Sequence, residues 1–360
     1  MDARWPRLIA AVVVFVVATA VGVMLVGRFD TAPDPETFIN QVTADSLALI
    51  TIVALILATA TYLVLERAQT GRLASLEGQF TTRTFALMPV AIALNIVLGA
   101  AVANALKIPI YLDSIGTILV GVLCGPIAGA LTGAATNLLW SYAIPPPFQS
   151  GPAAAFAVTA VAIGVIAGVV GRMGLLRPRP DQPPRALALG GGLTIGLILV
   201  MSYLAFLGYE AIIGQVALAP ESDNQLLLIL GWFAMALIAA TVLGLIALLA
   251  IRRDLTAAYV VVVGIGTGIV AALISAPIAA GVFGGVTGAG TDFLVAAFRA
   301  GGADVAAATV GQGLISDPID KVVTFFVVYL ILNAMARRTK ARFPQGERLL
   351  DTADNREAFA

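Results

Sequence analysis

Histidine is absent from this chain of 360 residues, and cysteine occurs once, as Cys124. Without histidine, the chain lacks the usual general base of enzymes and the commonest protein ligand of metal ions. A single cysteine excludes disulfide frameworks and cysteine-based zinc sites. The chain also lacks a GxxxxGK[ST] phosphate-binding loop. We therefore expect a protein that is not an enzyme and that uses no metal and no cofactor.

Charged residues are scarce as well. They make up 12% of the chain, whereas hydrophobic residues make up 59%; soluble domains carry about 25% charged residues. The 21 basic and 21 acidic side chains balance, so no basic surface indicates nucleic acid as a partner. This composition predicts a polytopic α-helical membrane protein whose surroundings are a lipid bilayer.

Long runs without charge indicate the membrane spans. A helix needs about 20 apolar residues to cross a bilayer. Six runs are each suited to a single crossing: Leu8–Gly27, Ser46–Leu65, Thr84–Leu106, Ala186–Gly208, Leu226–Ile251 and Leu255–Ala276. Two further regions, 114–171 and 276–336, are too long for one helix and contain glycine and proline breaks. We expect an all-α protein with about twelve transmembrane helices, or at least ten.

Arginine and lysine indicate the orientation, because they are enriched in cytoplasmic loops. If the N-terminus lies inside, all but four of the 21 basic residues fall on the inner side; the four exceptions are Arg28, Lys107, Arg299 and Lys321. The pattern therefore predicts a protein of the plasma (inner) membrane with both termini in the cytoplasm.

Segments 121–139 and 276–294 match each other. The block Thr132-Gly-Ala-Ala-Thr-Asn137 recurs as Thr287-Gly-Ala-Gly-Thr-Asp292. A small residue occurs at every fourth position leading into each block. In the first segment these residues are Gly121, Gly125, Gly129 and Gly133, and in the second they are Ala276, Ala280, Gly284 and Gly288. Residues four apart share a helix face, where small side chains let two helices approach closely. The glycines are therefore expected to be helix-packing positions. The match between the two segments indicates a duplication, and chance similarity of two Ala/Gly-rich segments is the alternative.

The wider layout favours a duplication. Each half has two plain helices around an acidic outer loop, then a helix, a broken small-residue region and a final helix that ends in arginines. We expect two parallel six-helix repeats, at 1–180 and 186–340, and a cytoplasmic tail at 341–360. Internal repeats of this kind are common in transporters, which hold their substrate between or within the halves.

One stretch of the first half resembles a known family. Lys107-Ile-Pro-Ile-Tyr-Leu-Asp113-Ser-Ile-Gly-Thr117, followed by Gly125-Pro-Ile-Ala-Gly129-Ala-Leu-Thr-Gly133-Ala-Ala-Thr-Asn137, resembles the substrate-binding S components of energy-coupling factor (ECF) vitamin transporters. The resemblance covers 84–172 well and 255–336 loosely. It implies capture of a vitamin-like molecule or a metal ion, with ATP hydrolysed by separate ATPase subunits that act through a coupling subunit. Because members of that family are usually shorter, this chain would be a duplicated form.

The resemblance points to Lys107 and Asp113 as substrate-binding residues, because S components gather substrate contacts at the corresponding outer loop. A structural role is the alternative: Asp113-Ser114 could cap a helix, and Lys107 could extend to the membrane surface. The duplicated Asn137 and Asp292 are expected to point towards protein rather than lipid. A carboxylate at membrane depth needs a counter-charge or a polar cavity, and Arg299 is one candidate for Asp292.

Asp317, Asp320 and Lys321 lie at the start of the last predicted helix, and with Gln312 they could bind a polar ligand near the outer face. The structural alternative makes Asp317 the helix cap and pairs it with Lys321 one turn later. Two aromatic residues, Tyr111 and Trp140, are assigned to the membrane-interface belt. Asn95 is expected to form interhelical hydrogen bonds.

The leading interpretation is an uptake protein that binds a vitamin-like or other small polar nutrient and is energised by a separate ECF ATPase module. A self-contained secondary transporter of two six-helix halves is the first alternative, and it would need an ionisable group such as Asp292 for ion coupling. A membrane sensor or scaffold that transports nothing is the second.

Overall fold

The computed structural model describes residues 4–25, 41–100, 111–145, 149–213, 243–251 and 253–350. All regular secondary structure in these ranges is helical, so the all-α class is confirmed for them. The long helices are α1 (Arg4–Leu25), α2 (Gln41–Thr70), α4 (Thr82–Ala100), α6 (Pro126–Tyr142), α7 (Ala157–Met173), α8 (Pro184–Ile213), α10 (Thr256–Phe283) and α12 (Val305–Ala334). The shorter elements are α3 (Ala74–Gln79), α5 (Ile115–Cys124), η2 (Gly151–Phe156), α11 (Asp292–Ala300), α13 (Arg337–Ala341) and η3 (Gly346–Leu349).

The helices suit a bilayer in both length and surface. Within the described ranges, five segments are long and apolar enough to cross one: Trp5–Leu25, Asp45–Thr70, Thr82–Ala100, Gly151–Met173 and Thr256–Phe283. Their exposed side chains include Val16 and Val97, whereas Asn95 and Asp320 are fully buried. An apolar outside around a hydrogen-bonded polar inside is what lipid requires of a protein. These features support a helical membrane protein.

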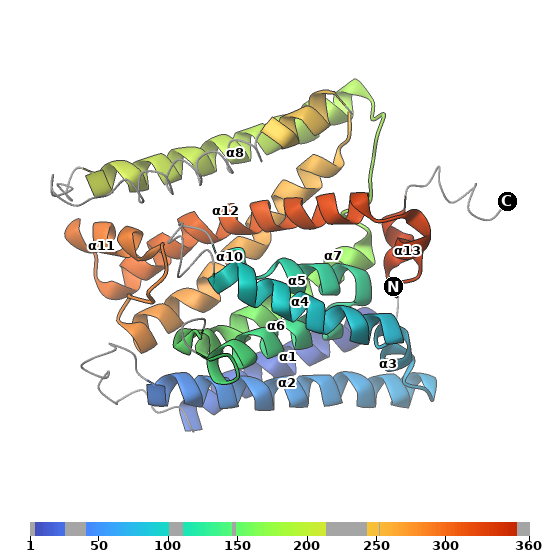
Figure 1. Ribbon diagram of the computed structural model, residues 1–360, viewed down its shortest axis with the longest axis horizontal. Coiled ribbons are helices and arrows are strands. Elements are labelled where there is room, and N and C mark those ends of the chain that lie inside the picture. The colour runs from blue at the N-terminus through green and yellow to red at the C-terminus, as the bar shows by residue number, and fades with distance from the viewer. Residues whose placement is uncertain are drawn as a thin grey trace.

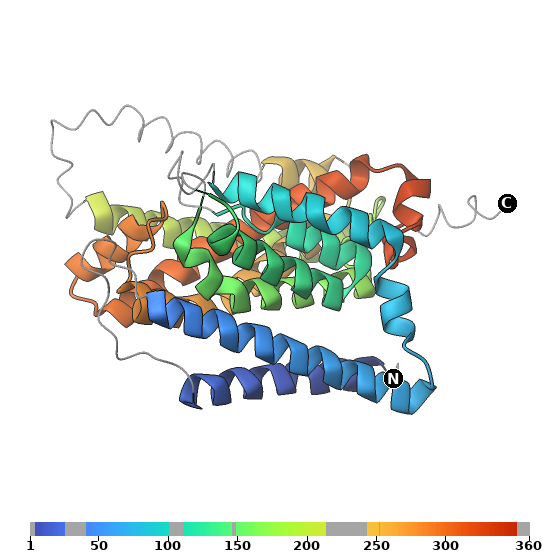
Figure 2. The ribbon, with the colours of Figure 1, turned by 60° about the horizontal axis from the view of Figure 1, so that its bottom comes forward.

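The helices run roughly parallel or antiparallel to one another in a bundle (Figure 1). α1 and α2 pack together along one side, as Figure 2 shows, and α2 contacts η2 and α7. α5, α6 and α7 pack against one another in the middle, α10 packs against α12, and α8 lies on the side opposite α1 and α2. The two halves of the sequence meet where α10 contacts α7 and α12 contacts α5.

The start of α1, together with α3 and α13, lies at one end of the bundle (Figure 1). The segment after α13 is bound there through Gln345. Its backbone N–H donates to the carbonyl of Leu123 at 2.8 Å, and its side-chain amide donates to the carbonyls of Gly121 at 3.3 Å and Gly168 at 3.2 Å. The C-terminal end of α5 therefore lies at the same end of the molecule as Arg337 and Arg338 of α13, which is called the arginine-bearing end below.

α5 is a half-length helix inside the bundle. Its ten residues are all buried, and at about 1.5 Å per residue they span about 15 Å, half of the hydrocarbon core. Because the last turn of α5 lies at the end held by Gln345, its first turn lies deep inside the bundle. The first backbone N–H groups of such a helix have no partner within the helix itself; the side chain of Asn95 accepts that of Gly116 at 2.7 Å.

Three of the expected helix-packing glycines lie at close helix crossings. A Cβ added at Gly121 would lie 2.7 Å from Ala167 Cβ, one at Gly129 would lie 2.6 Å from the carbonyl oxygen of Gly164, and one at Gly133 would lie 2.5 Å from the carbonyl oxygen of Ala160. Each of these partners is on α7. α6 and α5 therefore contact α7 through backbone rather than through large side chains.

The other three glycines expected at helix-packing positions lie at turns with positive φ. Gly125 joins α5 to α6 with φ of +124°. Gly284 and Gly288 lie after α10 with φ of +58° and +80°, and nothing lies within 4 Å of an added Cβ at either. These glycines permit turns that other residues rarely adopt. Gly284 and Gly288 are not closely packed, whereas a Cβ added at Gly125 would lie 2.5 Å from Gln79 Oε1. The two matched segments therefore differ in conformation.

Two expected helix breaks are also absent. Pro277 lies inside α10, and Pro318 lies inside α12. The cap of α12 is Asp304, whose carboxylate accepts the backbone N–H of Ala307 at 2.7 Å, so Asp317 is not a helix cap. Membrane helices tolerate internal proline because neighbouring groups satisfy the freed backbone atoms. Here the Pro318 backbone also packs directly on Gly268 of α10.

We predict that Gly268→Leu destabilises the protein, whereas Gly266→Leu does not. An added Cβ at Gly268 would overlap the backbone of Pro318, but nothing lies within 4 Å of one at Gly266 on the same helix. Overpacking of this kind costs about 1–3 kcal/mol. Thermal unfolding of the purified variants measures the difference. Equal unfolding temperatures for the two variants would show that α10 and α12 do not cross at this point.

Candidate ligand-binding cavity

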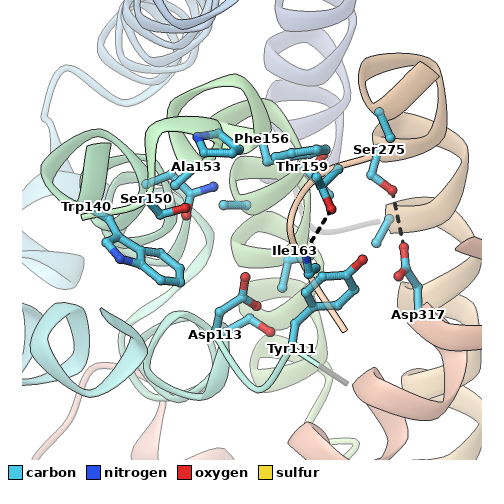
Figure 3. A pocket seen from close by; sticks show the side chains of 18 of the residues that line it. Tyr111, Asp113, Trp140, Ser150, Ala153, Phe156, Thr159, Ile163, Ser275 and Asp317 are labelled. Atoms are coloured by element: carbon cyan, nitrogen blue, oxygen red, sulfur yellow. Dashed lines mark hydrogen bonds between the residues drawn. The ribbon is translucent and has the colours of Figure 1, made fainter. Parts of the chain in front are cut away.

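A cavity of about 140 Å³ lies between the two halves of the bundle. Its walls come from the segment before α5, from α6, η2 and α7, and from α10, the loop after it and α12. Figure 3 shows Trp140 and Asp317 at opposite sides, with Thr159 and Tyr111 between them. Engineered protein cavities of about 150 Å³ bind benzene. The space therefore suits a molecule about the size of one six-membered ring.

Most of the candidate site residues meet at this cavity, although they are far apart in the sequence. Six of them line it: Asp113, Asn137, Asp292, Gln312, Asp317 and Lys321. Asp320 is fully buried beside Lys321. Lys107 lies outside the described residues. The structure thus brings polar groups from both matched segments to one place.

A buried ion pair holds one wall of the cavity. Lys321 Nζ lies 2.6 Å from Asp320 Oδ2 and 3.9 Å from Asp113 Oδ1, and it donates to Ser114 Oγ at 2.8 Å. The other oxygen of Asp320 accepts the backbone N–H groups of Tyr111 at 3.0 Å and Leu112 at 2.9 Å. α12 is therefore bound through polar contacts to the segment that leads into α5.

Leu112 has φ of +50°, which leucine rarely adopts. Such a backbone persists only where its surroundings hold it. The hydrogen bond to Asp320 supplies that restraint, and it orients the next residue, Asp113, whose carboxylate lines the cavity.

Asp317 is 6% exposed and lines the cavity from α12. Its carboxylate accepts the hydroxyl groups of Ser275 and Ser316, both at 3.3 Å. Among the described residues, no lysine or arginine nitrogen lies within 4 Å of it. The expected close pair of Asp317 and Lys321 does not form, because Lys321 turns to Asp320 and Ser114 instead.

Asp292 holds the loop after α10 in place. It accepts the backbone N–H and the hydroxyl of Thr287, the latter at 2.9 Å, and the backbone N–H of Gly288 at 2.7 Å. Burial raises the pKa of the Asp292 carboxyl, whereas these hydrogen bonds lower it. Arg299 is not its counter-charge; its guanidinium donates to the carbonyl of Ala303 at 3.5 Å. Backbone N–H groups therefore stabilise the Asp292 carboxylate, a role for which a cation was expected.

Two asparagines differ in their contacts. Asn95 donates to Thr117 at 2.9 Å and to Thr136 at 3.1 Å, and it accepts the backbone N–H of Gly116 at 2.7 Å. It therefore joins three helices, as expected of an interhelical hydrogen-bonding residue. Asn137 is also buried, but it lines the cavity and makes no contact like those of Asp292.

The sequence did not predict that aromatic side chains line the cavity. Tyr111 and Trp140, both assigned to the membrane interface, line the cavity together with Phe156. The hydroxyl of Tyr111 pairs with that of Thr291 at 2.7 Å. Spacing offered a signal, since Trp140 follows Asn137 by three residues and shares its helix face. Thr159 also lines the cavity, and its buried hydroxyl has no hydrogen-bond partner among the described residues.

We predict that Asp320→Asn strongly destabilises the protein, because it leaves Lys321 buried without its nearest counter-charge. Removing one partner of a buried ion pair costs about 3–5 kcal/mol. The double variant Asp320→Asn/Lys321→Gln should recover part of that loss. Asp304→Asn, at the exposed start of the same helix, is the control. Denaturant or thermal unfolding provides the comparison, and a single-variant loss no larger than that of the control would contradict the prediction.

Comparisons with known proteins give no family assignment: no family model, no curated protein and no solved structure matches this chain. The resemblance to S components therefore rests on the residues quoted for it above. What the structure adds is the arrangement of those residues, since both resembling segments contribute walls to the same cavity.

Proposed function

We propose that this chain is a membrane uptake protein that binds a small polar molecule in the cavity between α5–α7 and α10–α12. One observation carries the proposal: charged side chains from both halves of the sequence face one cavity inside the bundle. Ionisable groups within membrane helices are costly, and they commonly mark substrate or ion pathways. Ligand sites are also concave, largely preformed and lined by apolar groups with a few placed polar ones.

The ECF resemblance gives the proposal its mechanism. The segments that resemble S components, 84–172 and 255–336, contain all the residues that line the cavity. We propose that the chain captures the substrate, while a coupling subunit and ATPase subunits supply the energy. In this proposal the arginine-bearing end and both termini face the cytoplasm, and the protein lies in the plasma membrane. The chain itself is then a binding protein and not an enzyme.

The organisation into twelve helices and two parallel repeats belongs to this proposal. Its divisions at 1–180 and 186–340 assign α1 to α7 to the first repeat and α8 to α12 to the second. A substrate held between halves is common in transporters built from repeats. The position of the cavity, with walls from both sides of that division, supports such an arrangement.

A self-contained secondary transporter is the second candidate, and one observation favours it. Ion coupling needs an ionisable group inside the membrane. Asp317 meets that requirement better than Asp292, because the described residues place no cation within 4 Å of it, whereas Asp292 is held by backbone N–H groups. Uptake that persists without any ATPase partner would favour this candidate.

We predict that filling the cavity removes a small molecule that otherwise co-purifies with the protein. Ala279 lines the cavity, so Ala279→Leu places bulk inside it. Gly281→Leu, on the same helix, is the matched control, because nothing lies within 4 Å of an added Cβ there. After mild purification, mass spectrometry should find one molecule enriched with wild type and with Gly281→Leu but depleted from Ala279→Leu.

The same preparation tests the energy source. An integral coupling subunit and an ATPase pair that co-purify reproducibly would support the ECF mechanism, and their consistent absence would support the secondary transporter. Unfolding temperatures of both variants establish that each is folded. A molecule retained equally by wild type and by folded Ala279→Leu would contradict binding in this cavity.

A further inference from the structure

We propose that the ligand of this cavity is a small organic cation built on one ring, which binds with its charge beside Asp317 and Asp113. The inference rests on the proposed function and adds the chemical class of the substrate. It follows from the charges around the cavity, from the aromatic side chains that line it, and from one hydroxyl group that has no partner.

The charges around the cavity do not balance within the described residues. Lys321 is the only lysine or arginine among the described lining residues, and Asp320 neutralises it at 2.6 Å. Asp113 lies further from the same ammonium group, at 3.9 Å, and its side chain keeps 31% of its surface exposed. For Asp317, no lysine or arginine nitrogen of a described residue lies within 4 Å. The described lining residues therefore include more acidic than basic side chains.

Asp317 is the centre of that excess. Its two hydroxyl contacts, at 3.3 Å, are longer than the 2.5–2.7 Å usual for a hydroxyl donating to a carboxylate. A buried carboxylate needs either a close counter-charge or strong hydrogen bonds. The cavity is the open side of Asp317, so a bound cation is the partner that the site lacks.

The aromatic side chains suit the same ligand. Tyr111, Trp140 and Phe156 line the cavity, and Phe156 is fixed by stacking on Phe283 with ring centroids 5.6 Å apart. Aromatic faces attract cations and favour flat rings. Figure 3 shows Trp140 on the side of the cavity opposite Asp317, so a ring near Trp140 can direct a charged substituent towards the carboxylate.

Thr159 supplies an independent indication that a ligand belongs here. It is 7% exposed, lines the cavity from α7, and its hydroxyl finds no hydrogen-bond partner in the part of the chain that the structure describes. Buried polar atoms are nearly always paired, so an unpaired one at a cavity wall indicates a missing partner. A hydrogen-bonding group on the ligand, separate from its charge, would supply it.

An anionic ligand is disfavoured by the same contacts. Lys321 already donates to Asp320 and Ser114, so an anion would meet a lysine that is occupied. It would also face the carboxylates of Asp113 and Asp317, and like charges at close range disfavour binding.

Three probes of one shape test the sign of the charge: benzylammonium, benzyl alcohol and benzoate. Each carries one six-membered ring, and they differ in being cationic, neutral and anionic at pH 7. Isothermal titration of the full-length purified protein should give at least tenfold weaker binding of benzyl alcohol than of benzylammonium, and no measurable binding of benzoate. Benzoate that binds as well as benzylammonium, or the failure of benzylammonium to bind, would overturn the inference.

Substitutions then test which carboxylate binds the cationic group of the probe. Asp317→Asn should weaken benzylammonium at least tenfold and leave benzyl alcohol unchanged, whereas Asp304→Asn, at the exposed start of the same helix, should affect neither. If Asp317→Asn does not fold, Asp113→Asn replaces it in the test. That variant should also weaken benzylammonium binding, by a smaller factor, and leave benzyl alcohol binding unchanged. Unchanged benzylammonium affinity in the folded variant would overturn the inference.

The two proposals can fail separately. A neutral or anionic molecule that co-purifies with wild type and is lost from Ala279→Leu would overturn the cationic assignment and leave the proposed binding function in place. No co-purifying molecule, together with no binding of any probe, would overturn both.

Discussion

The ion pair of Lys321 and Asp320 is the interaction on which the centre of the molecule depends. Charges inside a membrane protein are tolerated only when they are paired and hydrogen-bonded. Here Asp320 also accepts two backbone N–H groups from the segment before α5, and Lys321 also donates to Ser114. These contacts hold Leu112 in its left-handed conformation, fix the start of α5 inside the bundle, and join the two halves of the sequence around one cavity.

Two helix crossings of the same kind frame that cavity. In α7, Gly168 packs on the backbone of Pro126, and in α10, Gly268 packs on the backbone of Pro318. Both glycines belong to similar stretches, GVIAGVV at 164–170 and GIGTGIV at 264–270. Small residues bring these helices into backbone contact. The cavity wall begins about one turn away along each helix, so rigid crossings flank the polar groups.

Much of the site could be predicted from sequence, because ionisable and amide side chains are rare enough in this chain to stand out. Asp113, Asn137 and Asp317 were all candidates, and they line one cavity. The contacts of each were harder to predict. Proline ordinarily ends helices, but Gly268 accommodates Pro318 inside α12, which moves Asp317 from a helix cap to a cavity wall. Trp140 was missed because an aromatic residue near a helix end fits the membrane interface equally well.

Trp140 emission is the most direct test that this cavity is the ligand site. The chain has three tryptophans, so Trp5→Phe with Trp232→Phe leaves Trp140 as the single reporter. Titration with benzylammonium should change Trp140 emission saturably, over the same concentrations that raise the unfolding temperature. Emission that stays constant while the protein is stabilised would place binding elsewhere and contradict the account.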